Sequence, residues 1–176
     1  MPGKVHIVGA GPGDPELMTI KGVRLLGEAD LVLYAGSLVN EKILEFCRDS
    51  CEKASSADMP LEDQISLMSG AASSGKCVVR LHTGDPSLYG AISEQIRMLG
   101  ENGIECEIVP GVSSLQGAAA RLGIEYTVPG GTQTLICTRV AGCTPVREAE
   151  DIGRLAAHGA SLAVFLSAEM ADAVSD

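Results

Sequence analysis

The stretch GAGPGDPELMTIKG, residues 9–22, directly follows the apolar run of residues 5–8. Strand-forming side chains give way here to a turn rich in glycine and proline, and a helical pattern begins near Thr19. A buried strand that passes through a glycine-rich turn into a helix is typical of the first unit of an open α/β sheet. The pattern raises the question of whether this turn holds a dinucleotide, a triphosphate or a ligand without phosphate.

Neither of the common phosphate-binding motifs fits this turn. A dinucleotide fingerprint needs G-x-G-x-x-G, and Asp14 stands where its third glycine should be. The second expected strand ends in residues 34–37, YAGS, without the carboxylate that would bind a ribose. A P-loop needs G-K-[ST], which does not follow, and Pro12 and Pro15 lack the backbone N–H that a phosphate cradle uses. The turn therefore favours an uncharged or cationic ligand, or is a plain strand-to-helix connection.

Strands and helices alternate along residues 1–122. The pattern predicts strands over residues 4–8, 29–34, 52–55, 76–82 and 105–109. Helices are expected between them, over residues 19–28, 41–46, 61–73 and 91–102. Such alternation predicts an α/β fold with a mostly parallel sheet that is covered on both faces. We expect residues 1–122 to form an N-terminal αβα domain.

Residues 123–176 look like the beginning of a second, C-terminal αβ domain. The segment 124–132, IEYTVPGGT, reads as a linker. It is followed by an expected strand over 133–139, a helix over 148–158 and a strand over 161–167. These elements are too few to close a core of their own, so we expect either an incomplete domain in a truncated chain or a domain that needs help from its partner.

Composition narrows the classes of function. The 176 residues carry a formal net charge of −10 and only 3% aromatic side chains, which argues against a nucleic-acid partner. No signal peptide or membrane-length apolar run is recognisable, so a cytoplasmic protein is expected. The six cysteines form no C-x-x-C pair and lie near no histidine cluster, so reduced thiols and no metal site are predicted. They are Cys47, Cys51, Cys77, Cys106, Cys137 and Cys143.

Four loops rich in small residues follow expected parallel strands. Besides the first turn, they are residues 34–40, 82–90 and 110–114. The carboxyl ends of parallel strands meet at one edge of the sheet, where open α/β proteins bind ligands. The three later loops are rich in small residues and offer hydroxyls at Thr83, Ser87, Ser113 and Ser114, with one carboxylate at Asp85. The four loops together predict a polar cleft with few charges.

At this point the sequence resembles the tetrapyrrole methylase family, and the resemblance covers essentially the whole chain. The motifs are GAGPGDP at residues 9–15, TGDPS at 83–87 and PGVSS at 110–114. YAGSLVN at 34–40 and TRVAGCTPV at 138–146 are similar to the branch that methylates precorrin-4 or cobalt-precorrin-4 at C11 in cobalamin biosynthesis. The resemblance implies two αβα domains, S-adenosylmethionine as cofactor in the cleft between them, and a homodimer.

The resemblance also implies the cofactor contacts. They fall on Pro12, Thr83, Gly84, Asp85, Leu88, Ser113, Ser114 and Leu166. Asp85 can accept hydrogen bonds from an ammonium or ribose group, and Gly84 allows a close backbone approach. The two serines stand at a helix start, where they can bind a ligand, cap the helix or do both.

The tetrapyrrole substrate that the resemblance implies carries many carboxylates, whereas the chain is acidic overall. Positively charged side chains are therefore expected at the substrate site. Arg139 and Arg147 flank the 138–146 loop and are the predicted contacts, with Arg80 and Lys76 as further candidates. A base must accept a proton, but the sequence does not name it. Relatives that methylate uroporphyrinogen place an aspartate after the tyrosine matching Tyr34, whereas this chain has Ala35. This departure is consistent with a different substrate carbon.

Three interpretations remain open. The first is the C11-methyltransferase of precorrin-4 or its cobalt-containing equivalent. The second is another family member, acting on a neighbouring precorrin or on diphthine. The third is a cofactor-binding fragment without catalysis, because family members continue past Asp176 with the segment that completes the adenine pocket.

Overall fold

The chain consists of two units, Met1–Gly117 and Ala118–Asp176. The structure, a computed structural model, describes residues 3–142 and 144–175, so Cys143 of the 138–146 motif lies outside the described residues. The division falls inside α4 (Ser114–Leu122), whereas the sequence places the domain boundary at the end of that helix.

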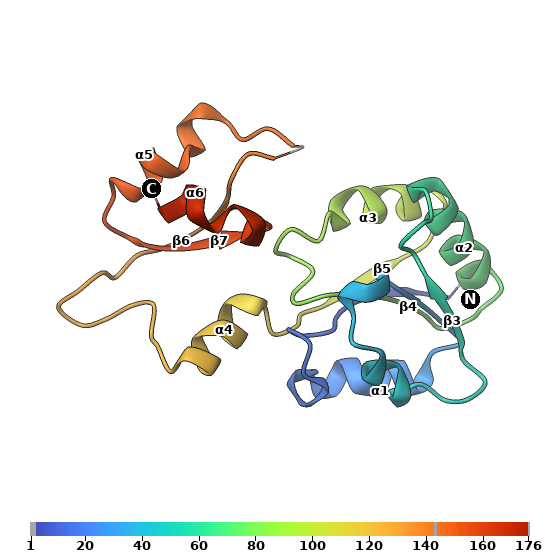
Figure 1. The fold of residues 1–176 in the computed structure, drawn as a ribbon. Helices are drawn as coiled ribbons and strands as arrows, with labels where there is room; N and C mark the ends of the chain where they lie inside the picture. The colour runs from blue at the N-terminus through green and yellow to red at the C-terminus, as the bar shows by residue number, and fades with distance from the viewer. Residues whose placement is uncertain (1–2, 143, 176) are drawn as a thin grey trace. The chain divides into compact units, whose positions relative to one another are not determined.

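Five parallel strands form the sheet of the first unit (Figure 1). Their order across the sheet is β3-β2-β4-β1-β5. Their bounds are β1 (Val5–Gly9), β2 (Leu31–Tyr34), β3 (Glu52–Ser55), β4 (Val78–His82) and β5 (Cys106–Val109). The prediction of an α/β fold with a mostly parallel sheet is confirmed.

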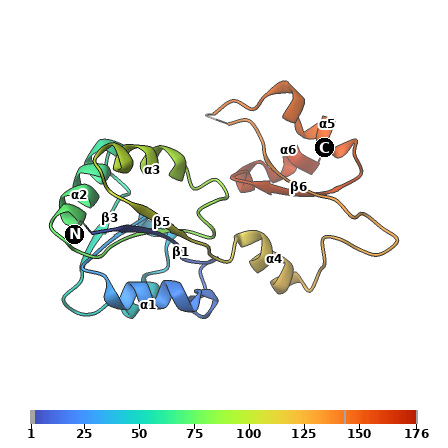
Figure 2. The ribbon, with the colours of Figure 1, turned by 180° about the vertical axis from the view of Figure 1, so that it is seen from behind.

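Helices cover both faces of this sheet, as Figures 1 and 2 show. One face carries α1 (Ile20–Glu28) and the 3₁₀ helix η3 (Glu41–Phe46), whose Leu25, Leu26 and Ile43 are buried against the strands. The other face carries α2 (Leu61–Ser73) and α3 (Ile92–Glu101), with Ile65, Met68 and Leu99 buried. The helical segment expected over residues 41–46 is present and is a 3₁₀ helix.

The strand order places a topological switch point between β1 and β4. These strands are neighbours, in register from Val5 opposite Val78 to Gly9 opposite His82. The chain leaves β1 through α1 on one face and leaves β4 through α3 on the other (Figure 1). Connections that depart to opposite faces open a crevice at the carboxyl ends of the strands. The candidate site is built there.

The second unit contains the parallel pair β6 (Leu135–Arg139) and β7 (Ser161–Phe165). Between them lie η4 (Glu148–Glu150) and α5 (Ile152–Ala156), and η5 (Ala168–Met170) and α6 (Ala171–Ser175) follow. The predicted continuous helix over 148–158 is wrong, because Asp151 is extended (ψ 137°). Its carboxylate accepts hydrogen bonds from the N–H groups of Gly153 and Arg154 and so begins a new helix.

Across the described residues, no helix combines the length and the apolar character needed to cross a bilayer.

The turns after β1, β4 and β5 approach so closely that side chains do not fit between them. A Cβ on Gly9 would lie 2.6 Å from both Gly111 Cα and Gly84 O. A Cβ on Gly111 would lie 2.8 Å from Gly9 Cα and would collide with Gly84 O. Both neighbours are backbone atoms, which cannot move aside as a flexible side chain can. Glycine is therefore required at both positions.

We expect Gly111→Ala to destabilise the protein by about 2–3 kcal/mol, because the added methyl group must push two turns apart. Gly70→Ala is the matched control: Gly70 lies inside α2 and a Cβ there meets nothing within 4 Å. It should stabilise the protein by up to about 1 kcal/mol through helix propensity. Urea denaturation measures both, and equal effects of the two variants would refute the close approach.

Candidate functional site

Reciprocal hydrogen bonds join the first turn to the turn after β4. Gly84 N donates to Gly11 O over 2.8 Å, and Gly11 N donates to Gly84 O over 3.2 Å. Both glycines have positive φ, 74° at Gly11 and 61° at Gly84, a conformation that L side chains rarely adopt. Ala10 N adds a third bond by donating to His82 O over 2.7 Å. The two turns therefore form one rigid piece of backbone.

The Asp85 carboxylate joins the third turn to this piece. Its Oδ2 accepts a hydrogen bond from Gly111 N over 2.9 Å, and its Oδ1 accepts from Ser87 N over 2.8 Å and from the Ser87 hydroxyl. Burial alone would raise the pKa of this carboxyl, but the bonds from Ser87 and Gly111 outweigh burial and hold the pKa below its ordinary value. Asp85 is thus ionised at neutral pH and fastens the β4 and β5 turns together.

Asn40 attaches the loop after β2, and the sequence analysis gave this side chain no role. Its Nδ2 donates to Gly13 O over 2.7 Å, while its Oδ1 accepts from Lys42 N over 3.1 Å and caps η3. An asparagine directly before a helical segment predicts the cap. The bond to Gly13, however, joins segments 27 residues apart and has no local signal. All four turns are now connected.

Seven of the eight predicted cofactor contacts belong to these turns and the start of α4. Gly84 and Ser113 are buried and Asp85 is half-buried, while Thr83 and Ser114 are exposed. A Cβ on Gly84 would lie 3.7 Å from Ser113 Cα and 3.8 Å from Ser114 N, so Gly84 faces the beginning of α4. The remaining two, Pro12 and Leu88, are half-buried.

The donor set of this rim suits a ligand with hydroxyl, amino and carboxyl groups. It offers the hydroxyls of Thr83 and Ser114, the backbone beside Gly84 and one lone pair left on Asp85 Oδ2. It presents no Lys or Arg side chain within residues 9–15, 83–87 and 110–114, as a phosphate site would. The rim therefore fits a nucleoside with an amino-acid tail, such as S-adenosylmethionine, better than a nucleotide.

Leu166, the eighth residue, belongs to the second unit. It directly follows β7, is 78% exposed and has a positive φ of 56°. A bulky residue in this conformation is strained, and such strain is concentrated at functional positions. Its contact with the cofactor stays a prediction.

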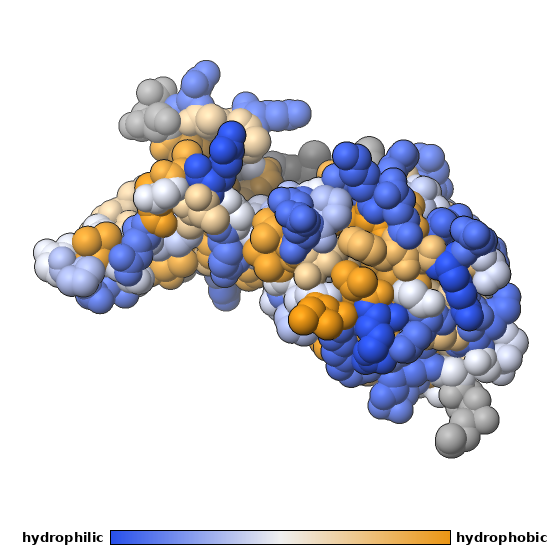
Figure 3. Space-filling view, turned by 90° about the horizontal axis from the view of Figure 1, so that it is seen from below, coloured by the Kyte–Doolittle hydropathy of each residue, from blue (hydrophilic) through white to orange (hydrophobic). Residues whose placement is uncertain are grey.

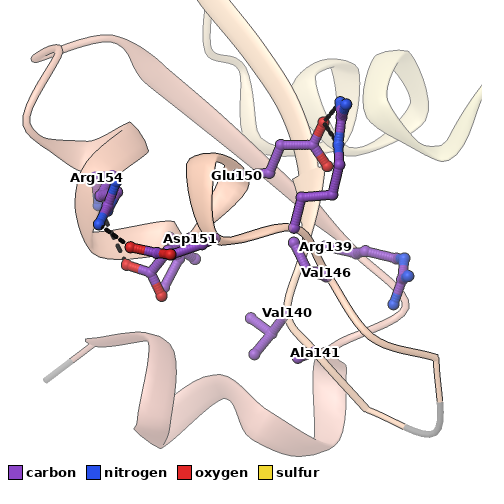
Figure 4. Close-up of a pocket in the computed structure, with 10 residues that line it drawn as sticks. Arg139, Val140, Ala141, Val146, Glu150, Asp151 and Arg154 are labelled. Atoms are coloured by element: carbon purple, nitrogen blue, oxygen red, sulfur yellow. Dashed lines mark hydrogen bonds and ion pairs between the residues drawn. The ribbon is translucent and has the colours of Figure 1, made fainter.

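The predicted substrate contacts Arg139 and Arg147 line the same hollow of about 410 Å³ in the second unit (Figure 4). Arg139 donates to the carbonyl oxygens of Thr144 over 2.9 Å and Pro145 over 2.8 Å. Arg147 pairs with Glu150, whose hydrogen bond raises the pKa of the guanidinium. Arg139 hydrogen-bonds only to neutral oxygens there, and its electrostatic interaction with Glu150 is not an ion pair, so its guanidinium is less fully neutralised than that of Arg147.

Within the described residues, no group of three or more metal-ligating side chains is assembled, and the cysteines of that part of the chain are free thiols.

The role of Asp85 can be tested through Asp85→Asn, which we expect to destabilise the protein by about 1–3 kcal/mol at pH 7. The substitution would remove the negative charge. Because an amide has only one acceptor oxygen, its NH2 group would face either Gly111 N or the donors of Ser87. The folded pKa lies below the unfolded value of about 3.9, so the stabilisation is complete above that pH and is lost as pH falls through the folded pKa. The stability gap should therefore shrink below about pH 4.

Urea denaturation from pH 3 to pH 7 measures this gap. Asp14→Asn is the control, because exposed Asp14 caps η1 through Glu16 N and asparagine caps equally well. A gap for Asp85→Asn that does not change with pH would contradict the assigned role.

Comparison with known proteins identifies the family of this chain. A sequence profile of the Tetrapyrrole (Corrin/Porphyrin) Methylases matches residues 4–176. The cobalt-precorrin-4 C(11)-methyltransferase of Methanocaldococcus jannaschii is 56% identical over 97% of this chain and 66% of that protein. The precorrin-4 C(11)-methyltransferase of Pseudomonas aeruginosa is 49% identical over 92% of this chain and 64% of that protein. The chain thus spans just under two thirds of these relatives' own length.

Comparison with solved structures leads to the same family. The X-ray structure of the cobalt precorrin-4 methyltransferase CbiF superposes with a TM-score of 0.94 at 47% identity, over 97% of this chain and 72% of that chain. The uroporphyrin-III C-methyltransferase of Thermus thermophilus, solved as a complex with S-adenosylhomocysteine, gives a TM-score of 0.76 at 30% identity, over 98% of this chain and 72% of that chain. With its four connected turns and its parallel sheet, this chain belongs to the tetrapyrrole methylase family.

Proposed function

We propose that this protein is part or all of an S-adenosylmethionine-dependent methyltransferase that methylates precorrin-4 or cobalt-precorrin-4 at C11 in cobalamin biosynthesis. The observation that carries this proposal is the hydrogen-bonded rim formed by residues 9–15, 83–87 and 110–114, which has no phosphate-binding motif and no Lys or Arg side chain. Two relatives and one solved structure support it, because each is named as a methyltransferase of precorrin-4 or cobalt-precorrin-4. Each is identical to this chain at about half of the aligned positions.

The cofactor would lie on this rim. Gly84 would let the ligand approach the backbone closely, and the hydroxyls of Thr83 and Ser114 would bind its polar groups. Pro12 would pack against its apolar parts, next to α4, where a Cβ on Gly117 would come within 2.9 Å of the proline ring. The remaining proposed contacts are Leu88, Ser113 and, from the second unit, Leu166. When bound, S-adenosylmethionine supplies an activated methyl group.

Asp85 acts mainly by holding the turns. Three hydrogen bonds from Ser87 and Gly111 already occupy most of its acceptor capacity, which leaves one lone pair for a ligand. Its proposed contact with the cofactor is therefore a single hydrogen bond rather than a bidentate ion pair.

The protein's contribution to the reaction is alignment. A fixed rim can hold donor and acceptor in line and exclude water, and such positioning lowers the barrier by several kcal/mol, about 7–11 in well-oriented cases. No strong nucleophilic side chain is needed. Ala35 follows Tyr34 in this chain, so no carboxylate base stands at that position. The residue that accepts the proton is not assigned.

Arg139 is the stronger of the two proposed substrate contacts. Its guanidinium is bound only by carbonyl oxygens, whereas Arg147 is neutralised by Glu150 and Arg154 by Glu148. A polycarboxylate substrate would gain from the first cation and would have to displace a carboxylate from the others.

We further infer a homodimer in the cytoplasm. Large apolar side chains reach the surface of the first unit, among them Ile20 at 90% exposure and Leu38 at 68%, and Figure 3 shows apolar residues interrupting the polar surface on the side that α1 covers. Apolar side chains that gather in one exposed patch are typical of an interface, and we propose that these residues contribute to one. The free thiols of Cys47 and Cys51 support a reducing compartment.

Isothermal titration with S-adenosylhomocysteine tests cofactor binding directly. We expect one site per chain, and we expect Thr83→Val to weaken binding by about 1 kcal/mol, the typical contribution of one hydrogen bond. Because Thr83 is exposed, the free energy of unfolding of this variant should stay within about 0.5 kcal/mol of that of the unaltered protein. Ser93→Ala, an exposed hydroxyl on α3, should leave binding unchanged.

Incubation with S-adenosylmethionine and precorrin-4 or cobalt-precorrin-4 then tests the reaction through the mass of one added methyl group. Heat of binding without turnover would favour a cofactor-binding fragment, and turnover of another precorrin would favour a different family member. No binding of S-adenosylhomocysteine at all would contradict the proposal.

A further inference from the structure

Arg80 is a buried cation that faces neutral partners. It lies in β4, is 5% exposed, and donates to Leu33 O over 3.2 Å and to Gln95 Oε1 over 3.3 Å. In the part of the chain that the structure describes, no carboxylate lies within 4 Å of its guanidinium. Burial lowers the pKa of Arg80 to about 10, which still leaves it charged at neutral pH.

The other titratable groups nearby do not balance this charge. His82 is 7% exposed, and burial together with the charge of Arg80 lowers its pKa to about 4, so it is neutral. Asp85 follows three residues later and is ionised, but its carboxylate binds Ser87 and Gly111 and forms no ion pair with Arg80. Gln95 belongs to the first turn of α3, whose N-terminal end adds positive potential. Among the described residues, no carboxylate in contact with Arg80 therefore balances its charge.

The other arginines show how unusual this arrangement is for the chain. Five of them pair with a carboxylate, and they are Arg24, Arg48, Arg97, Arg147 and Arg154. Arg121 and Arg139 have no such partner among the described residues, but both are at least partly exposed to water. Arg80 alone in the described residues is both buried and without a carboxylate.

Stability does not explain this arrangement. Removing a charge from water costs free energy, and two neutral acceptors restore only part of it, so the hydrogen bonds of Arg80 do not account for a cation at this position. Arg80 lies two residues before the end of β4, and β4 leads into the turn of residues 83–87 where ligands are proposed to bind. A buried charge is screened less than a surface charge and acts over a longer distance. In a chain with a net charge of −10, it would oppose the general repulsion of an anionic ligand.

We propose that Arg80 determines the charge preference of the site: its unpaired positive charge, held by Leu33 O and Gln95, attracts a polycarboxylate tetrapyrrole to the carboxyl edge of the sheet. This inference rests on the proposed function and deepens it. Arg80 is a specificity-determining residue that acts through its field, without touching the reacting atoms.

Gln95→Glu tests this directly, because it supplies the missing counter-charge while it keeps an acceptor oxygen facing Arg80. Ser93→Glu is the matched control, since it adds the same charge on the same helix at an exposed position. The probe is uroporphyrin III, a stable tetrapyrrole with eight carboxylates, and its uncharged octamethyl ester is the reference ligand. Fluorescence titration gives the affinities for both probes, without any need for turnover.

We expect Gln95→Glu to bind the acid roughly 3- to 10-fold more weakly than the unaltered protein, because the added carboxylate cancels the charge of Arg80. Binding of the ester and of S-adenosylhomocysteine should stay within about twofold. Thermal unfolding of this variant should occur at an equal or higher temperature. Ser93→Glu should change none of these quantities by more than about twofold.

Arg80→Met provides a second variant that removes the charge and keeps apolar packing. It should weaken binding of the acid and spare the ester. Equal affinity of all variants for the acid, or a parallel loss for acid and ester, would overturn the inference, as would an unaltered protein that does not bind the acid. Loss of S-adenosylhomocysteine binding in the unaltered protein would instead count against the proposed function, so the two failures are distinguishable.

Discussion

The close approach of three glycine backbones is the constraint on which the rest of the structure depends. Gly9, Gly84 and Gly111 lie so near one another that a Cβ on Gly9 or on Gly111 would separate the turns after β1, β4 and β5. The contact is kept by the reciprocal bonds between Gly11 and Gly84 and by the bond from Gly111 N to Asp85. Because these are backbone groups on the ends of buried strands, the rim is as rigid as the sheet itself. A ligand that binds there meets a surface already in its bound form.

In this arrangement, one group of side chains holds the turns together and a different group is available to bind the ligand. The carboxylate of Asp85 is the obvious polar group of the rim, yet most of its hydrogen-bonding capacity is used to hold Ser87 and Gly111. Ligand recognition would then be left to hydroxyls and backbone groups, which suits the proposed cofactor without phosphate. The proposed sources of positive charge are Arg80 in β4 and, in the second unit, Arg139.

The strand-and-turn pattern allowed the first unit to be predicted in detail. Buried parallel strands are continuous apolar runs, and glycine with proline marks their ends, so all five strands were located within about two residues. The helix over residues 148–158 was predicted wrongly, because the break at Asp151 depends on a side chain that caps a new helix instead of continuing the old one. Propensity alone does not distinguish these outcomes at a residue such as aspartate.

The site was predicted only as far as local motifs reach. The turns at 9–15, 83–87 and 110–114 were recognisable, but the partners of Asn40 and Arg80 were not, since Gly13 and Leu33 lie 27 and 47 residues away in sequence. The central claim is that the connected turns form one preformed binding surface. Hydrogen–deuterium exchange with and without S-adenosylhomocysteine tests it most directly. If the surface is preformed, the hydrogen-bonded amides of residues 9–15, 83–87 and 110–114 are protected already without the ligand, and protection in these turns that appears only when the ligand binds would contradict the claim.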